Sequence, residues 1–194
     1  MKNKSKLTGA DYLLLLLYLD NQKPINSAVR LTKMMFIFKE EIAPLLRKNG
    51  VTIDDLPMFT AYNYGPFSKD VYEQVELFQS IEFITVKDLN ATEEMDEVDD
   101  WEENAFIDEF TEESEQYKNS RDGKYMQYKI LKRGKEYVKS EIIPQISDTQ
   151  VEILSTFKER IIKTPIKAIL KYVYVKYPDM TENSLIKGEV LGHE

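Results

Sequence analysis

The chain of 194 residues is 42% hydrophobic, contains no cysteine and carries a formal net charge of −8. This length and apolar content suit one domain with one hydrophobic core. The absence of cysteine excludes disulfides, thiolate zinc sites and cysteine nucleophiles. We therefore expect a single domain over residues 1–194.

The negative charge is concentrated in one segment, Glu93–Glu115. This segment holds 13 of the 34 acidic residues and no Lys or Arg, which leaves 21 acids against 26 basic residues elsewhere. Such a charge run is usually a solvated loop, yet Met95, Val98 and Trp101 recur in it at every third position. These apolar residues predict contact with the protein's own body, with a basic groove that the carboxylates mask, or with an external partner.

The N-terminus resembles a secretory signal because three lysines among the first six residues precede the apolar run Tyr12–Leu19. However, Asp11 and Asp20 bracket a run of about eight residues, whereas a membrane helix needs roughly twenty. We expect a buried first helix and a cytoplasmic protein that does not enter the membrane.

Capping residues and prolines predict the first two helices. Thr8 can cap a helix that runs to about Asn21, and a second helix begins near Asn26 or Ser27. Apolar residues then recur at steps of three and four, which indicates a buried face. Pro44 should kink this helix or restart it.

The stretch Tyr62–Ser68 contains the pattern Tyr-Gly-Pro-Phe-Ser and leads into a predicted helix, Lys69–Ser80. Ser68 is a suitable N-cap, and Phe67 is placed to pack against Tyr72 across the first turn. Glycine and proline suit a tight approach to a helix start. The same residues could instead form a binding groove lined by the tyrosines.

Two short strands, Phe83–Val86 and Tyr125–Leu131, are expected to pair as a hairpin. The acidic segment would then be the hairpin loop, far longer than usual and therefore an insertion. Leu131–Gly134 should open a helix that ends near Ile143.

Two helices are expected after this point, Asp148–Ile162 and a second that starts with Thr164 as cap and Pro165 at its first position. Tyr172–Val175 also suits a strand. The predicted fold is thus mainly α with a small β-hairpin: a winged-helix-like core over residues 1–143 with the acidic insert 93–115 in the hairpin loop, and a C-terminal helical extension over residues 144–194.

Four stretches carry a resemblance to known families: Leu31–Phe36, Tyr64–Ser68, Tyr128–Gly134 and Leu170–Pro178. Together they resemble the YwgA-like proteins of bacteria and archaea and, more distantly, the Panacea (SocA-like) antitoxin domains. The resemblance implies a protein that acts by protein contact, because Panacea domains are associated with toxin neutralisation and with prophage or defence loci. The acidic insert departs from the compact pattern of these families.

The first functional hypothesis is a non-enzymatic regulatory or antitoxin-like protein whose partner is another protein, with a toxin among the candidates. The predicted contact residues are the aromatic residues of the insert and of the stretch before the third helix: Tyr62, Tyr64, Phe67, Trp101, Phe106 and Phe110.

The alternative is a winged-helix regulator that binds nucleic acid and is autoinhibited by the acidic insert. The helix Lys69–Ser80 opposes major-groove binding because Lys69 is its one base. Basic residues also recur from Lys158 to Lys176. The bases predicted to bind nucleic acid lie on the wing and the helix after it: Lys124, Lys129, Lys132, Arg133 and Lys135. A third hypothesis is a DNA mimic of phage origin that inhibits a nuclease or repressor.

No catalytic motif is recognisable in the sequence. The single histidine, His193, is the penultimate residue, and phosphate loops, dinucleotide turns and nucleophile elbows are missing. We predict no enzymatic activity, no cofactor and no metal site; the oligomeric state stays open.

Overall fold

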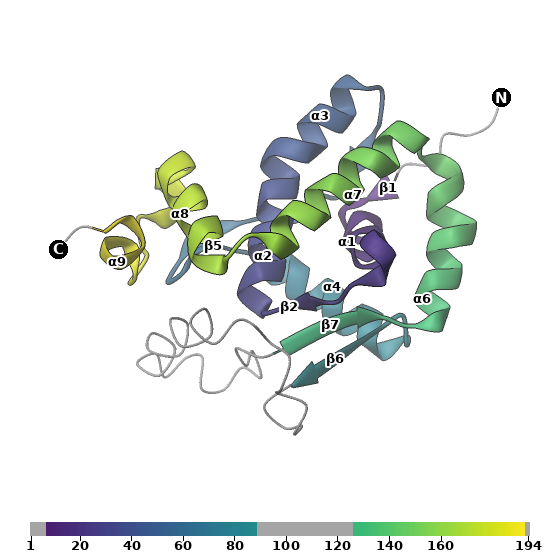
Figure 1. Cartoon of the computed structure of the whole chain (residues 1–194), viewed down its shortest axis with the longest axis horizontal. Helices are drawn as coiled ribbons and strands as arrows, with labels where there is room; N and C mark the ends of the chain where they lie inside the picture. Colours follow the sequence, from purple (N-terminus) through teal and green to yellow (C-terminus); the bar gives the residue numbers. More distant parts are fainter. Residues whose placement is uncertain (1–6, 89–125, 193–194) are drawn as a thin grey trace.

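The computed structural model describes residues 7–88 and 126–192. These residues form a mainly helical structure with small sheets, as predicted (Figure 1). Helix α1 (Gly9–Tyr18) lies at its centre, in contact with α7 (Asp148–Lys163) and strand β7 (Met126–Ile130). The core is therefore built around the first helix.

Helix α1 begins at the predicted cap. The backbone N–H of Asp11 donates to Thr8 Oγ1 at 3.3 Å, and Asp11 Oδ2 accepts from the Thr8 backbone N–H at 2.8 Å. Leu13–Leu17 are buried, as expected for a helix that is apolar on all sides. The preceding strand β1 (Leu7–Thr8) pairs in parallel with β3 (Ile53–Asp54).

The end predicted for α1, near Asn21, is wrong. The helix stops at Tyr18, and the 3-10 turn η1 (Asp20–Gln22) follows, with φ of 50°, 53° and 61° at its three residues. Left-handed backbone costs about 1–2 kcal/mol per residue, so contacts elsewhere must stabilise this turn. Strand β2 (Ile25–Asn26) comes next.

The second helix contains a π-helical turn just before Pro44. Helix α2 (Ala28–Ile37) continues through η2 (Phe38–Ile42) into α3 (Ala43–Lys48). At the junction the Ala43 N–H donates to Phe38 O, five residues earlier. Proline lacks an N–H and its ring clashes with the carbonyl four residues before it, so the wider turn accommodates the ring. The irregularity predicted at Pro44 is therefore this π turn.

Ser27 occupies the N-cap position of α2 with an unusual backbone, φ 75° and ψ 129°. Its Oγ is buried and has no partner among the described residues. The predicted start of the helix is confirmed, but the side chain does not cap it. Such a conformation costs about 1–3 kcal/mol.

We expect Ser27→Gly to raise the free energy of unfolding by about 1 kcal/mol, because glycine tolerates positive φ and removes the buried hydroxyl. Urea denaturation measures this difference. Ser147→Gly is the matched control: Ser147 caps α7 by accepting from the Gln150 N–H at 3.3 Å, so its loss should destabilise slightly. An equal destabilisation at both serines would contradict the prediction.

The stretch before the third helix folds as a hairpin of its own. Strand β4 (Thr60–Tyr62) pairs antiparallel with β5 (Gly65–Phe67), and helix α4 (Lys69–Ser80) follows. Ser68 caps α4 as predicted, since its Oγ accepts from the Val71 N–H at 3.3 Å.

The predicted pairing of the two strands as a hairpin is confirmed. Strand β6 (Ile84–Asp88) pairs antiparallel with β7, and β2 lies on the other side of β7. Residues 93–115 belong to the connection between β6 and β7, and they lie outside the described residues. Gly134 lets the next helix approach the sheet, because a Cβ there would lie 2.3 Å from Phe83 O.

The helix after β7 runs as α6 (Lys132–Tyr137), the π-helical η5 (Val138–Ile142) and the 3-10 turn η6 (Ile143–Gln145). Helix α7 follows close to its predicted bounds. The C-terminal part consists of α8 (Ile166–Lys176), the 3-10 turn η7 (Pro178–Thr181) and α9 (Lys187–Leu191).

Thr164 does not cap α8, so that prediction is wrong. Its Oγ1 donates to Arg160 O at 2.7 Å at the end of α7, and Pro165 holds the N-cap position. Proline can take the cap because its backbone is extended there, with ψ 143°. Tyr172–Val175 is helical, since Val173 and Tyr174 are buried on the inner side of α8.

Candidate functional site

Three aromatic rings form a row along β4, β5 and α4. The ring centroids of Tyr62 and Phe67 are 5.2 Å apart, and those of Phe67 and Tyr72 are 5.3 Å apart. All three side chains are half-buried, so each ring leaves part of its surface to solvent. We call Tyr62, Phe67 and Tyr72 the aromatic strip. It unites two predicted contact residues and confirms the predicted packing of Phe67 on Tyr72.

Tyr64, the third predicted contact residue near this hairpin, does not belong to the strip. It lies in the turn between β4 and β5 and packs against the hydrophobic core. Burial raises the pKa of Tyr174 to about 12, and the neighbouring Tyr64 acts in the same direction. Tyr64 is therefore part of the support of the hairpin. The other predicted contact residues, Trp101, Phe106 and Phe110, lie outside the described residues.

The hairpin is attached to the core through a buried lysine. Lys33 of α2 is 3% exposed, and its Nζ donates to Pro66 O at 2.9 Å. Pro66 pairs with Ala61 in the hairpin, and it has no N–H to offer. Burial lowers the pKa of Lys33 to about 7, because an ammonium group is poorly solvated in an apolar interior.

The C-terminal extension holds the other side of the hairpin turn. Asn63 O accepts from the Leu185 N–H at 2.9 Å and from Ser184 Oγ at 3.2 Å, and Ser184 Oγ lies 2.6 Å from the Tyr174 hydroxyl. Gly65 has φ 81°, and a Cβ there would lie 3.0 Å from the Tyr174 ring. The Tyr-Gly-Pro-Phe-Ser pattern was interpreted as a tight approach to a helix start. In the structure it forms a hairpin that is held between α2 and the C-terminal segment.

Two of the residues predicted to bind nucleic acid form ion pairs with acidic side chains. Lys132 Nζ lies 3.9 Å from Glu136 Oε1, and Arg133 Nη1 lies 3.4 Å from Glu82 Oε2. Lys129 is exposed on β7, and Lys135 is half-buried on α6. Lys124 lies outside the described residues.

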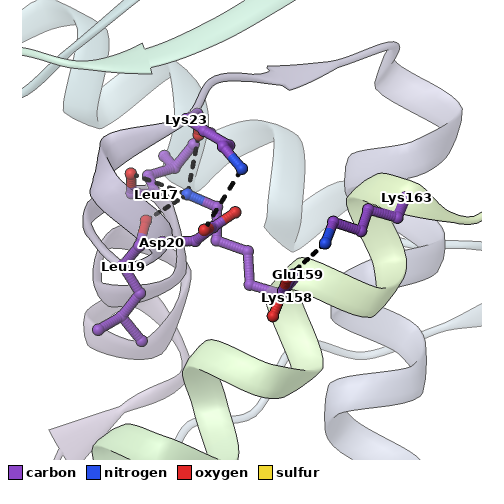
Figure 2. Close-up of polar contacts among 7 residues, drawn as sticks. All are labelled: Leu17, Leu19, Asp20, Lys23, Lys158, Glu159 and Lys163. Carbon is purple, nitrogen blue, oxygen red and sulfur yellow. Dashed lines mark hydrogen bonds and ion pairs between the residues drawn. The ribbon is translucent and has the colours of Figure 1, made fainter.

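Lys158, which the sequence pattern grouped with exposed bases, is fully buried. Figure 2 shows its ammonium directed at the end of α1, where Nζ donates to Leu19 O at 2.7 Å, Lys23 O at 2.8 Å and Leu17 O at 3.4 Å. Burial lowers its pKa to about 8, although the carboxylate of Asp20 acts in the opposite direction. The grouping was wrong because periodicity does not reveal which lysine faces the core.

Arg30 donates to carbonyls at the C-terminal end of α7, as Lys158 does at the end of α1. Its Nη1 donates to Ile161 O and Thr164 O, both at 2.6 Å, and Arg30 is 5% exposed. The last carbonyls of a helix have no partner within it and carry partial negative charge. Two buried cations therefore hold helix ends inside this protein and are not surface groups.

The part of the chain that the structure describes contains no helix long and apolar enough to cross a membrane. No group of three acidic, His or Cys residues converges there to hold a metal ion. No protein-family model, no curated protein and no solved structure matches the chain. The resemblance to the YwgA-like and Panacea families therefore stays a prediction.

Proposed function

We propose that the chain is a non-enzymatic regulatory or antitoxin-like protein that binds another protein through the aromatic strip. The observation that carries this proposal is the row of half-buried rings on a clamped hairpin. Protein interfaces are enriched in aromatic residues, and a rigid aromatic anchor loses little conformational entropy on binding. A toxin is the partner class that the family resemblance suggests.

The charge of α4 favours a protein partner over DNA. The order α1, α2, α4, β6, β7 and α6 supports a winged-helix core, in which α4 would be the helix that enters the major groove. Yet Asp70, Glu73 and Glu76 lie on α4, and its single base, Lys69, is paired with Glu73 at 2.8 Å. A phosphate backbone would meet net negative charge on this helix.

The test is a photo-crosslinking amino acid at position 67, followed by reconstitution with the purified partner. We expect Phe67→Ala to raise the Kd by at least about tenfold, as truncation of a central aromatic anchor does. Leu77→Ala is the control, because Leu77 is 55% exposed on the same α4 but lies outside the strip. If the partner is a toxin, Phe67→Ala should also fail to restore growth on co-expression.

Two results would refute the proposal. One is the absence of any crosslinked protein at position 67 while a position on α6 captures one. The other is a Kd that Phe67→Ala and Leu77→Ala change equally, since this would show that the strip is not the contact.

A further inference from the structure

Backbone oxygens converge at the C-terminal end of α1. The carbonyls of Leu17, Leu19 and Lys23 all accept from one ammonium group, that of Lys158, at 3.4, 2.7 and 2.8 Å. The last carbonyls of a helix have no partner within it and carry partial negative charge. The end of α1 therefore directs three oxygens at a single buried cation.

A carboxylate adds a full negative charge beside these carbonyls. Burial lowers the pKa of Lys158, and the charge of Asp20 opposes this effect. Asp20 Oδ1 lies 3.7 Å from Nζ of Lys23, a side chain at the surface, whereas Asp20 Oδ2 is buried and has no hydrogen-bond partner among the described residues. We call the three carbonyls and the Asp20 carboxylate the α1 cradle.

The turn η1 gives the cradle its shape. Asp20, Asn21 and Gln22 have φ of 50°, 53° and 61°, a left-handed conformation that is unfavourable for residues with a side chain. The turn brings the Lys23 carbonyl to the same ammonium as the carbonyls at the end of α1 (Figure 2). Strained backbone of this kind is concentrated where a protein holds a ligand. The strain in η1 thus serves to collect oxygens around a cation.

The distances and the charge of the cradle suit a monovalent cation. Mg²⁺ binds oxygens at about 2.0–2.1 Å and Ca²⁺ at about 2.3–2.6 Å, whereas the contacts to Leu19 O and Lys23 O are 2.7 and 2.8 Å. The single carboxylate balances one positive charge. Backbone carbonyls replace the hydration shell of K⁺ in potassium channels, and K⁺ is similar in size to an ammonium group. The cradle therefore fits either ion.

We propose that the α1 cradle is a monovalent-cation site that the chain fills with its own Lys158 ammonium. The ligand class is a primary ammonium ion or K⁺. The tethered ammonium makes the wild-type chain independent of such ions, and removal of the side chain opens the site to them. The cradle is separate from the aromatic strip, so this inference does not depend on the proposed function.

The test uses Lys158→Ala, which removes the ammonium and leaves the space of its buried stem. Urea denaturation is measured in n-propylammonium chloride, whose cation matches the part of lysine that the variant lacks, and in KCl. Tetramethylammonium chloride at equal concentration is the reference, because its cation has no N–H and is too bulky for the cradle. We expect both ions to raise the folding equilibrium constant about tenfold over the reference, as an ion at about ten times its Kd does.

Lys158→Met is the matched control. It removes the same charge, but its side chain keeps the space of the stem filled, so the two ions should change its folding equilibrium constant by less than about twofold. Wild type should behave in the same way, because its site is occupied. In Asp20→Asn/Lys158→Ala the gain should fall to about threefold or less, since the cradle loses its full negative charge.

Two results would overturn the proposal. One is that neither ion stabilises Lys158→Ala more than the reference salt does. The other is an equal gain for Lys158→Ala and Lys158→Met, which would show that the ions act on the chain in general and not at the cradle. If Lys158→Ala is unfolded in the reference salt, circular dichroism follows the same titrations as refolding, and a chain that stays unfolded in both ions overturns the proposal as well.

Discussion

Replacing Lys158 by methionine is expected to lower the free energy of unfolding by about 4 kcal/mol. The ammonium donates to the carbonyls of Leu17, Leu19 and Lys23, and methionine has a similar stem without donors. These carbonyls would lose the ammonium, and only Leu19 O would keep a printed donor, the Gln22 N–H at 3.1 Å; each group that stays unsatisfied costs about 1–3 kcal/mol. The left-handed turn that brings these carbonyls together would lose its support.

Lys163→Met is the control for this variant. Lys163 is on the same helix, but it is 66% exposed and pairs with Glu159 at the surface (Figure 2), where ion pairs contribute little. Urea denaturation at pH 7 should therefore show a far smaller loss for Lys163→Met. Equal losses for the two variants would show that the buried ammonium does not hold the end of α1.

A second large effect is expected in the pH dependence of stability, through Lys33. Burial lowers the pKa of Lys33 from 10.5 to about 7 in the folded chain. Between these two values the unfolded chain binds more protons than the folded chain, so stability rises with pH across this window. One pKa unit corresponds to about 1.4 kcal/mol, so the protonated amine costs about 4–5 kcal/mol below pH 7.

Lys33→Met removes this cost and also the hydrogen bond to Pro66 O. At pH 6 we expect the variant to be more stable than wild type by about 3 kcal/mol, after subtraction of about 1 kcal/mol for the lost bond. At pH 10 the advantage should be gone or reversed. Urea denaturation at a series of pH values measures both curves.

The exposed Lys139 supplies the control for the pH series. Lys139→Met should follow the wild-type curve, because this side chain lies at the surface of the folded chain. Parallel curves for wild type and Lys33→Met between pH 6 and pH 10 would contradict the lowered pKa.

The sequence predicted correctly those caps and strands that depend on residues close to one another in the chain. Thr8 and Ser68 cap their helices as expected, and Phe67 packs on Tyr72 across one turn. The pairing of β6 with β7 followed from alternation and propensity. Each of these depends on residues close in sequence or on a repeated pattern, so no knowledge of the rest of the chain was needed.

The errors occurred where a distant residue decides the local structure. The early end of α1 depends on Lys158, which is 139 positions away from Leu19, and no pattern near Leu19 shows it. Thr164 looked like the cap of α8, but Arg30 of α2 draws its carbonyl into the end of α7. The hairpin of Tyr62 and Phe67 looked like a simple approach to a helix, because its anchors lie on α2 and in the C-terminal segment.

In the candidate site, too, some features could be predicted from the sequence and others depend on the fold. The sequence predicted the aromatic residues before α4 as candidate contact residues, but only the fold separates Tyr64, which packs on the core, from Tyr62 and Phe67. Lys33 stands inside an apolar helix, which was an available signal for a buried charge. That signal does not say which acceptor the amine reaches.

The sequence by itself determined the mainly helical class, the caps at Thr8 and Ser68, the β6–β7 hairpin and the place of the acidic segment between these strands, because short-range periodicity and capping chemistry specify them. Only the tertiary structure decided which cations are buried. Lys158 and Arg30 look like surface bases in the sequence, yet each donates to backbone carbonyls of another segment, as Lys33 also does. Burying a charge requires partners from several segments at once, and those partners exist only after the chain has folded.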